Sequence, residues 1–234
     1  MKDQVKMIYF DLDHTLWDFE KNSKETLNKV FHNYHKIFMK TSLEDFIDSY
    51  LKINSKLWEM YRNKEISQDD LKLLRFEITL NALKIKHKEG LVREMNDFYL
   101  KTLAQQRHLV EGAFEVLDYL KENYELGILT NGFKNIQMTK MKSSQIIDYF
   151  NILVSSDDVG VPKPDEKIFE YAVTVAKKSK EEILYIGDDL ENDILPALKY
   201  GMKAIWFKNH QNKTQPTDNG ILSINKLVEL KNIF

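Results

Sequence analysis

Two aspartates stand two positions apart directly after a short apolar run near the start of the chain. The run from Val5 to Phe10 is apolar and β-prone, and it leads into Asp11-Leu12-Asp13-His14-Thr15. In an extended segment, residues two apart point to the same side, so both carboxylates can converge beyond the strand end. A carboxylate so placed can act as a nucleophile or as a general acid or base. The same spacing is common in solvated turns, so this pair alone identifies no reaction.

Two further polar clusters have the chemistry of an anion site. Thr130-Asn131-Gly132 combines a hydroxyl, an amide and the N–H groups of a glycine-containing loop, which are suitable donors to a phosphate. Read by itself, it is an Asn-Gly turn with a capping Thr. Lys163 stands between Pro162 and Pro164. The two prolines restrict the backbone and hold the charge of this lysine in place, unless it is simply a surface residue of a rigid loop.

A fourth cluster is acidic and runs from Gly187 to Asp193. Acidic residues at a helix start interact favourably with its dipole, and capping explains Asp189 and Glu191. The remaining carboxylates, gathered with Asp11 and Asp13, would repel one another unless a cation compensates them. Oxygen ligands favour a hard ion, and Mg²⁺ suits an open site that also holds a phosphate. Phosphoryl transfer is the chemistry that this combination indicates.

The four clusters follow short apolar runs that predict strands of one parallel sheet. Polar loops end each run, and helical stretches separate the runs. This alternation predicts an α/β fold with right-handed crossovers, in which ligands bind at the carboxyl ends of the strands. The expected strands after the first are Leu126 to Leu129, Ile152 to Val154, Ile183 to Ile186 and Ala204 to Phe207. The expected helices are Ala113 to Asn123, Asn135 to Ser143, Asp165 to Lys177 and Glu191 to Tyr200.

The segment from 17 to 106 interrupts this alternation. It has apolar residues at helical spacing and no strand-like run bounded by turns, which predicts an inserted unit of four helices. Thr41-Ser42-Leu43-Glu44 fits a capping box at a helix start, and Ser67-Gln68-Asp69-Asp70 is a weaker version. We therefore expect one domain from residues 1–16 and 107–234, and a second from residues 17–106. The stretch from Asn209 to Gly220 is the best candidate for a flexible loop.

Composition narrows the class of protein. The 234 residues carry a formal net charge of −2, which gives no sign of a nucleic-acid polymer or a membrane surface as a partner. The chain has no cysteine, so a covalent mechanism cannot use a thiolate. The first apolar stretch is too short for a signal peptide or a membrane span. A cytoplasmic location is the default expectation.

Together these motifs resemble the haloacid dehalogenase-like hydrolase superfamily. Its four motifs are matched in order by Asp11 to Thr15, by Thr130, by Lys163 and by the run from Gly187 to Asp193. The resemblance covers the whole chain and implies a Rossmann-like three-layer core with strand order 3-2-1-4-5. It also implies that the all-helical insert is a cap domain, placed between the first two motifs.

The resemblance also implies a role for each motif residue. Asp11 would be the nucleophile that forms an aspartyl phosphate, and Asp13 the general acid and then base. Thr130 and the Asn131 amide would bind phosphate oxygens, and Lys163 would neutralise the nucleophile and the phosphate. Mg²⁺ would be held by Asp11, the backbone carbonyl of Asp13 and Asp188, with Asp193 in support, all of which the motifs place after strands. A register shift of one residue would put Asp189 in place of Asp188.

Finer resemblance indicates the YjjG-type pyrimidine 5′-nucleotidases, which dephosphorylate nucleoside monophosphates. It is carried by Leu57 to Tyr61, Leu74-Arg75-Phe76, Thr130 to Phe133 and Asp158 to Phe169. Trp17 and Phe19 are candidates to stack on a base or to close the site, and packing at a hinge explains them equally well. Trp58 and Arg75 are weaker substrate candidates, because cap residues of these types more often pack or face solvent.

Alternative functions remain open at this point. A phosphatase or mutase for sugar phosphates, or a phosphatase for phosphoglycolate, has the same core motifs. A haloacid dehalogenase would not need an acid at Asp13. A phospho-accepting signalling module also uses acids, a Thr and a Lys at strand ends, but it is about half this length and lacks a helical insert. A catalytically silent binding protein has little support, since every expected catalytic residue is present. The substrate expected is a small phosphorylated metabolite, above all a nucleotide; the sequence does not set the oligomeric state.

Overall fold

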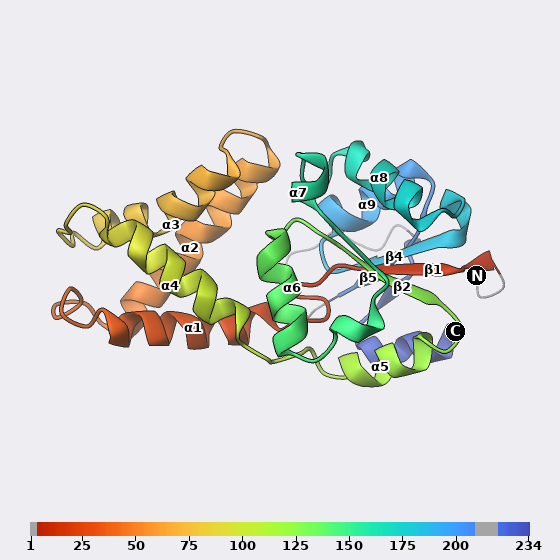
Figure 1. The fold of residues 1–234 in the computed structure, drawn as a ribbon, viewed down its shortest axis with the longest axis horizontal. Coiled ribbons are helices and arrows are strands. Elements are labelled where there is room, and N and C mark those ends of the chain that lie inside the picture. Colours follow the sequence, from red (N-terminus) through yellow and green to blue (C-terminus); the bar gives the residue numbers. More distant parts are fainter. Residues whose placement is uncertain (1–3, 209–219) are drawn as a thin grey trace. The chain divides into compact units, whose positions relative to one another are not determined.

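The computed structural model describes residues 4–208 and 220–234, and its centre is a parallel sheet (Figure 1). The strand order is β3-β2-β1-β4-β5-β6, and every neighbouring pair is parallel. The expected order 3-2-1-4-5 is confirmed, with a sixth strand added at one edge. The strands are β1 (Met7–Phe10), β2 (Glu125–Thr130), β3 (Ile152–Ser155), β4 (Ile183–Gly187), β5 (Lys203–Phe207) and β6 (Ser223–Ile224).

The apolar runs form strands because both faces of the sheet are covered. All four residues of β1 are completely buried. Met7 and Tyr9 share one apolar cluster with Ile168 and Phe169, so this side of the sheet packs on a helix. Removing such side chains from water stabilises the fold by about 1.5–3 kcal/mol each. The helices of this unit are α5 (Ala113–Leu120), α6 (Lys134–Ser143), α7 (Ser156–Val159), α8 (Glu166–Ala176) and α9 (Leu195–Tyr200).

Short non-α turns complete this unit. A π-helical turn at Leu190–Ile194 leads into α9, so the single helix expected from Glu191 begins as a wider turn. The other turns are 3₁₀ and lie at Ile147–Tyr149, Lys180–Glu182 and Leu227–Asn232. The last of these packs against α5. In Figure 1, α8 and α9 lie on one side of the sheet and α5 on the other.

The inserted segment contains four helices, as expected, joined by short non-helical connections. They are α1 (Phe19–Asn33), α2 (Leu43–Arg62), α3 (Gln68–Ala82) and α4 (Leu91–Ala104). At the start of α2 the cap is Ser42, whose side chain accepts a hydrogen bond from the Asp45 N–H, so the cap lies one residue after the expected Thr41. At the start of α3, Ser67 and Asp70 form both bonds of a capping box.

The chain divides into two compact units after Phe19 and after Gln106. The first boundary lies three residues beyond the one expected at Trp17. Trp17 belongs to the sheet-containing unit because it forms β-bridges with Asp13 and with Leu109. The Asp18 N–H also donates to the His108 carbonyl, so the outgoing and returning chains are paired before the insert begins.

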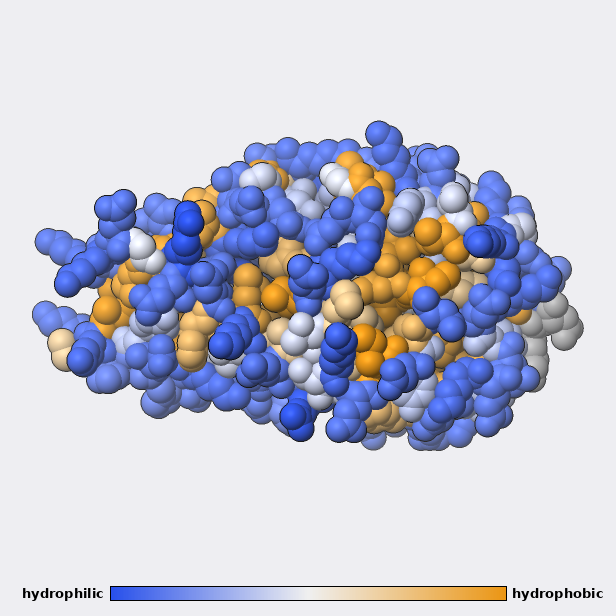
Figure 2. All heavy atoms as spheres, viewed as in Figure 1, coloured by the Kyte–Doolittle hydropathy of each residue, from blue (hydrophilic) through white to orange (hydrophobic). Residues whose placement is uncertain are grey.

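None of the helices formed by the described residues is long and apolar enough to cross a bilayer. The face in Figure 2 is mainly hydrophilic, with apolar atoms visible between the polar side chains. The loop expected from Asn209 to Gly220 lies, except for Gly220, outside the described residues.

Candidate active site

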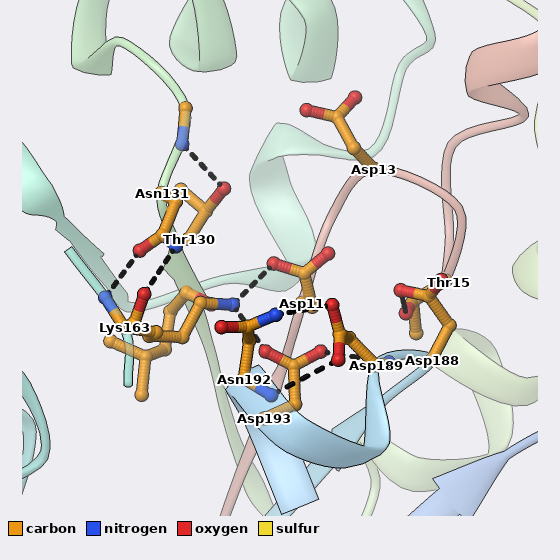
Figure 3. Close-up of polar contacts among 12 residues, drawn as sticks. Asp11, Asp13, Thr15, Thr130, Asn131, Lys163, Asp188, Asp189, Asn192 and Asp193 are labelled. Carbon is orange, nitrogen blue, oxygen red and sulfur yellow. Dashed lines mark hydrogen bonds and ion pairs between the residues drawn. The ribbon is translucent and has the colours of Figure 1, made fainter. Parts of the chain in front are cut away.

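Three carboxylates from two neighbouring strands converge at the carboxyl edge of the sheet. Asp11 follows β1, while Asp188 and Asp193 follow β4, the strand beside it. One oxygen from each side chain lies within 4.8 Å of the others (Figure 3). The sequence predicts that the first and fourth motifs meet at one place. In the structure, the aspartates of these two motifs do lie together.

A single buried lysine faces two of these carboxylates. The Lys163 Nζ lies 2.8 Å from an oxygen of Asp11 and 2.8 Å from an oxygen of Asp193. It also donates to the Leu129 carbonyl and to the Tyr185 hydroxyl. Lys163 is only 3% exposed, and these protein partners replace the water molecules that its ammonium would otherwise bind.

The charges of these residues shift one another's pKa. Burial raises the pKa of Asp11 to about 7; Lys163 lowers it, and Asp193 raises it. Burial also raises the pKa of Asp188, and the charges of Asp193 and Asp11 raise it further. Burial lowers the pKa of Lys163, but Asp11 and Asp193 outweigh burial and raise it overall. One ammonium contacts two of the three carboxylates, so the four side chains carry excess negative charge when ionised.

The loop that holds Lys163 is fixed by Asn131. The Asn131 amide donates to the Lys163 carbonyl at 2.9 Å, and the Asn131 Oδ1 accepts from the Lys163 N–H at 2.6 Å. This pair of bonds is visible in Figure 3. Asn131 therefore positions the lysine through both ends of its side chain, and the expected contact of its amide with a phosphate stays a prediction.

Asp188 and Asp189 are separated by their environments. The Asp189 Oδ1 accepts from the N–H groups of Glu191 and Asn192, and its Oδ2 accepts from the Asn192 side chain. Asp189 therefore caps the turn, while Asp188 contributes to the acid cluster. Gly187 makes room for this arrangement, since a Cβ there would collide with the Asp193 carboxylate.

The carboxylate of Asp13 lies apart from this cluster and is held by α6. Lys140 Nζ is 2.6 Å from its Oδ1 and 2.9 Å from its Oδ2, and the Gln137 Nε2 donates to Oδ2 at 2.9 Å. In Figure 3 the Asp13 side chain stands away from Asp11 and Asp188. The expected metal contact of Asp13 was through its backbone carbonyl, so the position of its side chain neither supports nor opposes it.

The two aromatic candidates near the first motif have different surroundings. Trp17 is completely buried, and the Lys140 Nζ lies 4.3 Å from the centroid of its ring. Trp17 packs inside the protein in this structure, and its contact with a substrate base stays a prediction. Phe19 is partly buried beside the ring of His14, with ring centroids 4.9 Å apart.

The two candidates in the helical unit also differ. Arg75 is 3% exposed, donates twice to the Asn96 Oδ1 and lies over the Tyr99 ring. It stabilises the interior of that unit, and its guanidinium is not presented to a ligand, so its substrate assignment is corrected. Trp58 is partly exposed and packs edge-on against Tyr61. It remains a candidate.

Three residues with a place in this site have no signal in the local sequence. Tyr185 has its hydroxyl 3.1 Å from an Asp193 oxygen, and Gln137 and Lys140 hold Asp13. Lys140 and Gln137 lie three residues apart on α6, a spacing that puts them on one helix face. In sequence they read as ordinary helix residues, and only the fold reveals their partners.

The acid cluster fits a divalent cation. When Asp11, Asp188 and Asp193 are ionised, the positive charge of Lys163 neutralises one of their three negative charges, so the net charge of the cluster is −2. All three carboxylates offer hard oxygen ligands. Asp11, Asp188 and Asp193 would hold the ion, and Mg²⁺ is the expected one because it binds through a few carboxylates and keeps positions for substrate oxygens.

Comparisons with known proteins agree with this geometry. A sequence model described as haloacid dehalogenase-like hydrolase matches residues 8–207. The pyrimidine 5′-nucleotidase YjjG of Escherichia coli is 31% identical over 97% of this chain and 96% of its own length. The pyrimidine 5′-nucleotidase PynA of Streptococcus pneumoniae is 32% identical over 90% and 87%. The magnesium-bound crystal structure of the putative hydrolase YfnB from Bacillus subtilis superposes with a TM-score of 0.86 at 27% identity, covering 98% of each chain.

Proposed function

The chain belongs to the haloacid dehalogenase-like hydrolase family, and within it we propose that the protein is a Mg²⁺-dependent phosphomonoesterase acting on pyrimidine nucleoside 5′-monophosphates. The observation that carries this proposal is the cluster of Asp11, Asp188 and Asp193 around one buried lysine. The substrate class rests on the similarity to YjjG and PynA over most of the chain.

Asp11 is the nucleophile in this proposal. A carboxylate oxygen of Asp11 attacks the phosphorus, and the bond from phosphorus to the nucleoside oxygen breaks. Asp13 gives its proton to that leaving oxygen, then takes a proton from the water that attacks the phosphorylated Asp11. Inorganic phosphate leaves, and both carboxylates return to their starting state. A bound Mg²⁺ would offset the negative charge of the phosphate beside Asp11.

The remaining residues bind and orient the reacting groups. Lys163 lies against Asp11 and places a positive charge where the phosphate would sit. Thr130 ends β2, next to the strand that carries Asp11, and supplies a hydroxyl for a phosphate oxygen. Asn131 fixes the backbone of Lys163, and Tyr185 contacts the same ammonium, so the charge is pre-positioned before substrate arrives.

A substrate panel tests the proposed reaction and its substrate. Purified protein is assayed with and without Mg²⁺ on nucleoside monophosphates, sugar phosphates, phosphoglycolate and p-nitrophenyl phosphate. We expect turnover only with the metal, and a kcat/KM for pyrimidine nucleotides at least about tenfold above that for sugar phosphates. Preference for a sugar phosphate would replace the substrate assignment, and a single turnover that leaves a stable phosphoprotein would indicate a signalling module.

A matched pair of variants tests the nucleophile. Asp11→Asn should lower turnover of p-nitrophenyl phosphate by at least about 1,000-fold, because the covalent step is lost. Asp148→Asn is the control, since Asp148 is exposed and forms no part of the site. Substantial turnover by Asp11→Asn with unchanged thermal unfolding would rule out the aspartyl-phosphate mechanism.

A further inference from the structure

One buried amide connects the expected phosphate-binding hydroxyl to the expected general acid. Gln137 of α6 is completely buried, and its Nε2 donates to the Thr130 Oγ1 at 2.8 Å and to the Asp13 Oδ2 at 2.9 Å. An amide nitrogen carries two hydrogens, so both are committed. The function proposed above gives Gln137 no role.

The contacts of Thr130 determine where its hydroxyl hydrogen can go. The Thr130 Oγ1 accepts from the Gln137 Nε2 and, at 3.1 Å, from the Gly132 N–H. A hydroxyl oxygen has two acceptor sites and one hydrogen, so both acceptor sites are in use. Among the described residues no group accepts the hydrogen of Thr130. The hydroxyl is thus prepared as a donor, which matches a phosphate oxygen and not a cation.

The orientation of the Gln137 amide is set by Asp13. In the structure both Asp13 oxygens accept from the Lys140 Nζ, so Asp13 is an accepting carboxylate in this state and the NH₂ end of the amide faces it. The opposite end, the Oε1, is buried without a partner in the described part of the chain. Leaving a buried acceptor unpaired costs about 1–3 kcal/mol. The two hydrogen bonds that the Nε2 donates, to Asp13 and to Thr130, offset that cost.

The loop backbone also leaves space for this amide. Gly132 lies directly against Gln137, and a Cβ at position 132 would collide with the amide group. The glycine of the Thr130-Asn131-Gly132 cluster therefore serves two contacts at once. Its N–H donates to the Thr130 Oγ1, and because it has no Cβ, the Gln137 amide can approach as the second donor to that oxygen.

We propose that Gln137 is a positioning residue that fixes the Thr130 hydroxyl as a hydrogen-bond donor to the phosphate. This inference rests on the proposed function, because it assigns Thr130 to a phosphate. Gln137 touches no atom of the substrate, and its second contact is with the expected general acid, Asp13. It acts by occupying one acceptor site of Thr130, which turns the hydroxyl hydrogen toward the ligand before binding and so avoids reorganisation during the reaction.

A double-mutant cycle tests this coupling. Gln137→Met keeps the length and approximate volume of the side chain and removes the donor, and Thr130→Val removes the hydroxyl. We expect each single change to lower kcat/KM by about 10- to 100-fold. In the Thr130→Val background, Gln137→Met should cost several-fold less than in the parent, because the hydroxyl it orients is gone and only its bond to Asp13 is still lost. Equal effects of Gln137→Met in both backgrounds would overturn the proposal.

Two further arms separate positioning from structure. Thr139→Met, an exposed change on the same helix, controls for a new methionine on α6 and should leave kcat/KM unchanged. If Gln137→Met does not fold, as judged by circular dichroism and thermal unfolding, Gln137→Leu replaces it. A loss with Thr139→Met as large as that with Gln137→Met would also overturn the proposal.

Binding of inorganic phosphate provides a readout that needs no turnover. Calorimetric titration of the Mg²⁺-loaded protein with phosphate should show about tenfold weaker binding for Gln137→Met, and the same non-additive behaviour with Thr130→Val. Absence of phosphatase activity together with this coupled binding would refute the proposed function and leave the role of Gln137 standing. Phosphatase activity with unchanged phosphate binding in Gln137→Met would do the reverse.

Discussion

At the scale of single residues, the site depends on where otherwise similar acids find their partners. Asp188 and Asp189 are adjacent in the chain, yet one joins the acid cluster and the other caps a turn. The residue types and the strand end were readable from the sequence. The division of roles was not, because it follows from the direction in which the backbone turns after Gly187.

This division predicts opposite outcomes for two neighbouring substitutions. Asp188→Asn should lower kcat by at least about 100-fold and abolish the thermal stabilisation by Mg²⁺, because a charged ligand is lost. Asp189→Asn should stay within about twofold of the parent, because Asn caps as well as Asp. Steady-state kinetics and thermal unfolding with and without Mg²⁺ measure both. The reverse pattern would mean that Asp189 is the ligand.

The ion pair of Lys140 predicts a loss of stability. Lys140 is 3% exposed and bonds both oxygens of Asp13, whose side chain is 22% exposed. Lys140→Met leaves that carboxylate without a cation and should lower the free energy of unfolding by about 1–3 kcal/mol. Lys142→Met, an exposed change on the same helix, should stay within about 0.5 kcal/mol. Urea unfolding measures both; equal stability of the two variants would show that the pair is energetically neutral.

At the scale of elements, the sequence predicted strands better than helix ends. Each strand from β1 to β5 comes from a compact apolar run bounded by polar residues, a pattern that burial on both faces requires. The sixth strand, Ser223–Ile224, is too short to produce such a pattern. The start of a helix depends on a single capping hydrogen bond, so neighbouring polar residues in the sequence are often equally good N-cap candidates. Thr41 and Ser42 are an example, since both precede acidic residues at suitable spacing.

The start of α2 can be tested by removing each hydroxyl in turn. The Ser42 side chain accepts from the Asp45 N–H and donates to the Asp45 Oδ2. Ser42→Ala should destabilise the helical unit by about 1 kcal/mol, the usual value of an N-cap, whereas Thr41→Ala should cost less than about 0.5 kcal/mol. Urea unfolding followed by circular dichroism compares the two variants. A larger loss for Thr41→Ala would place the cap at the residue that the sequence alone indicated.

At the scale of the whole molecule, the two backbone segments that flank the helical insert in sequence pair with each other. Trp17 bridges to Leu109, and the Asp18 N–H bonds the His108 carbonyl, so the insert leaves and returns at one place in the sheet-containing unit. Periodicity located the insert because helical and strand spacing differ. It placed the first boundary too early because Trp17 is apolar and precedes a helix, and only its pairing with Leu109 assigns it to the other unit.

The excess negative charge at the sheet edge makes the stability of the whole molecule depend on pH and metal together. Burial raises the pKa of Asp11 to about 7, against about 4 for an aspartate in the unfolded chain. Between these values the folded, metal-free protein binds more protons than the unfolded one. Its stability from this group is therefore complete below about pH 4 and is lost as the pH rises through about 7.

Mg²⁺ should reverse this loss, because it binds the deprotonated carboxylates and competes with protons. At 100 times its dissociation constant, a ligand stabilises by about 2.7 kcal/mol. We therefore expect Mg²⁺ to raise Tm by about 5–10 °C at pH 8, and by less than about half as much at pH 5. Differential scanning calorimetry with Mg²⁺ or a chelator measures both shifts, with Asp188→Asn as the variant that should not respond. An equal shift at both pH values would mean that the ion binds away from Asp11 and Asp188, because only ligands that must lose protons make metal binding weaken in acid.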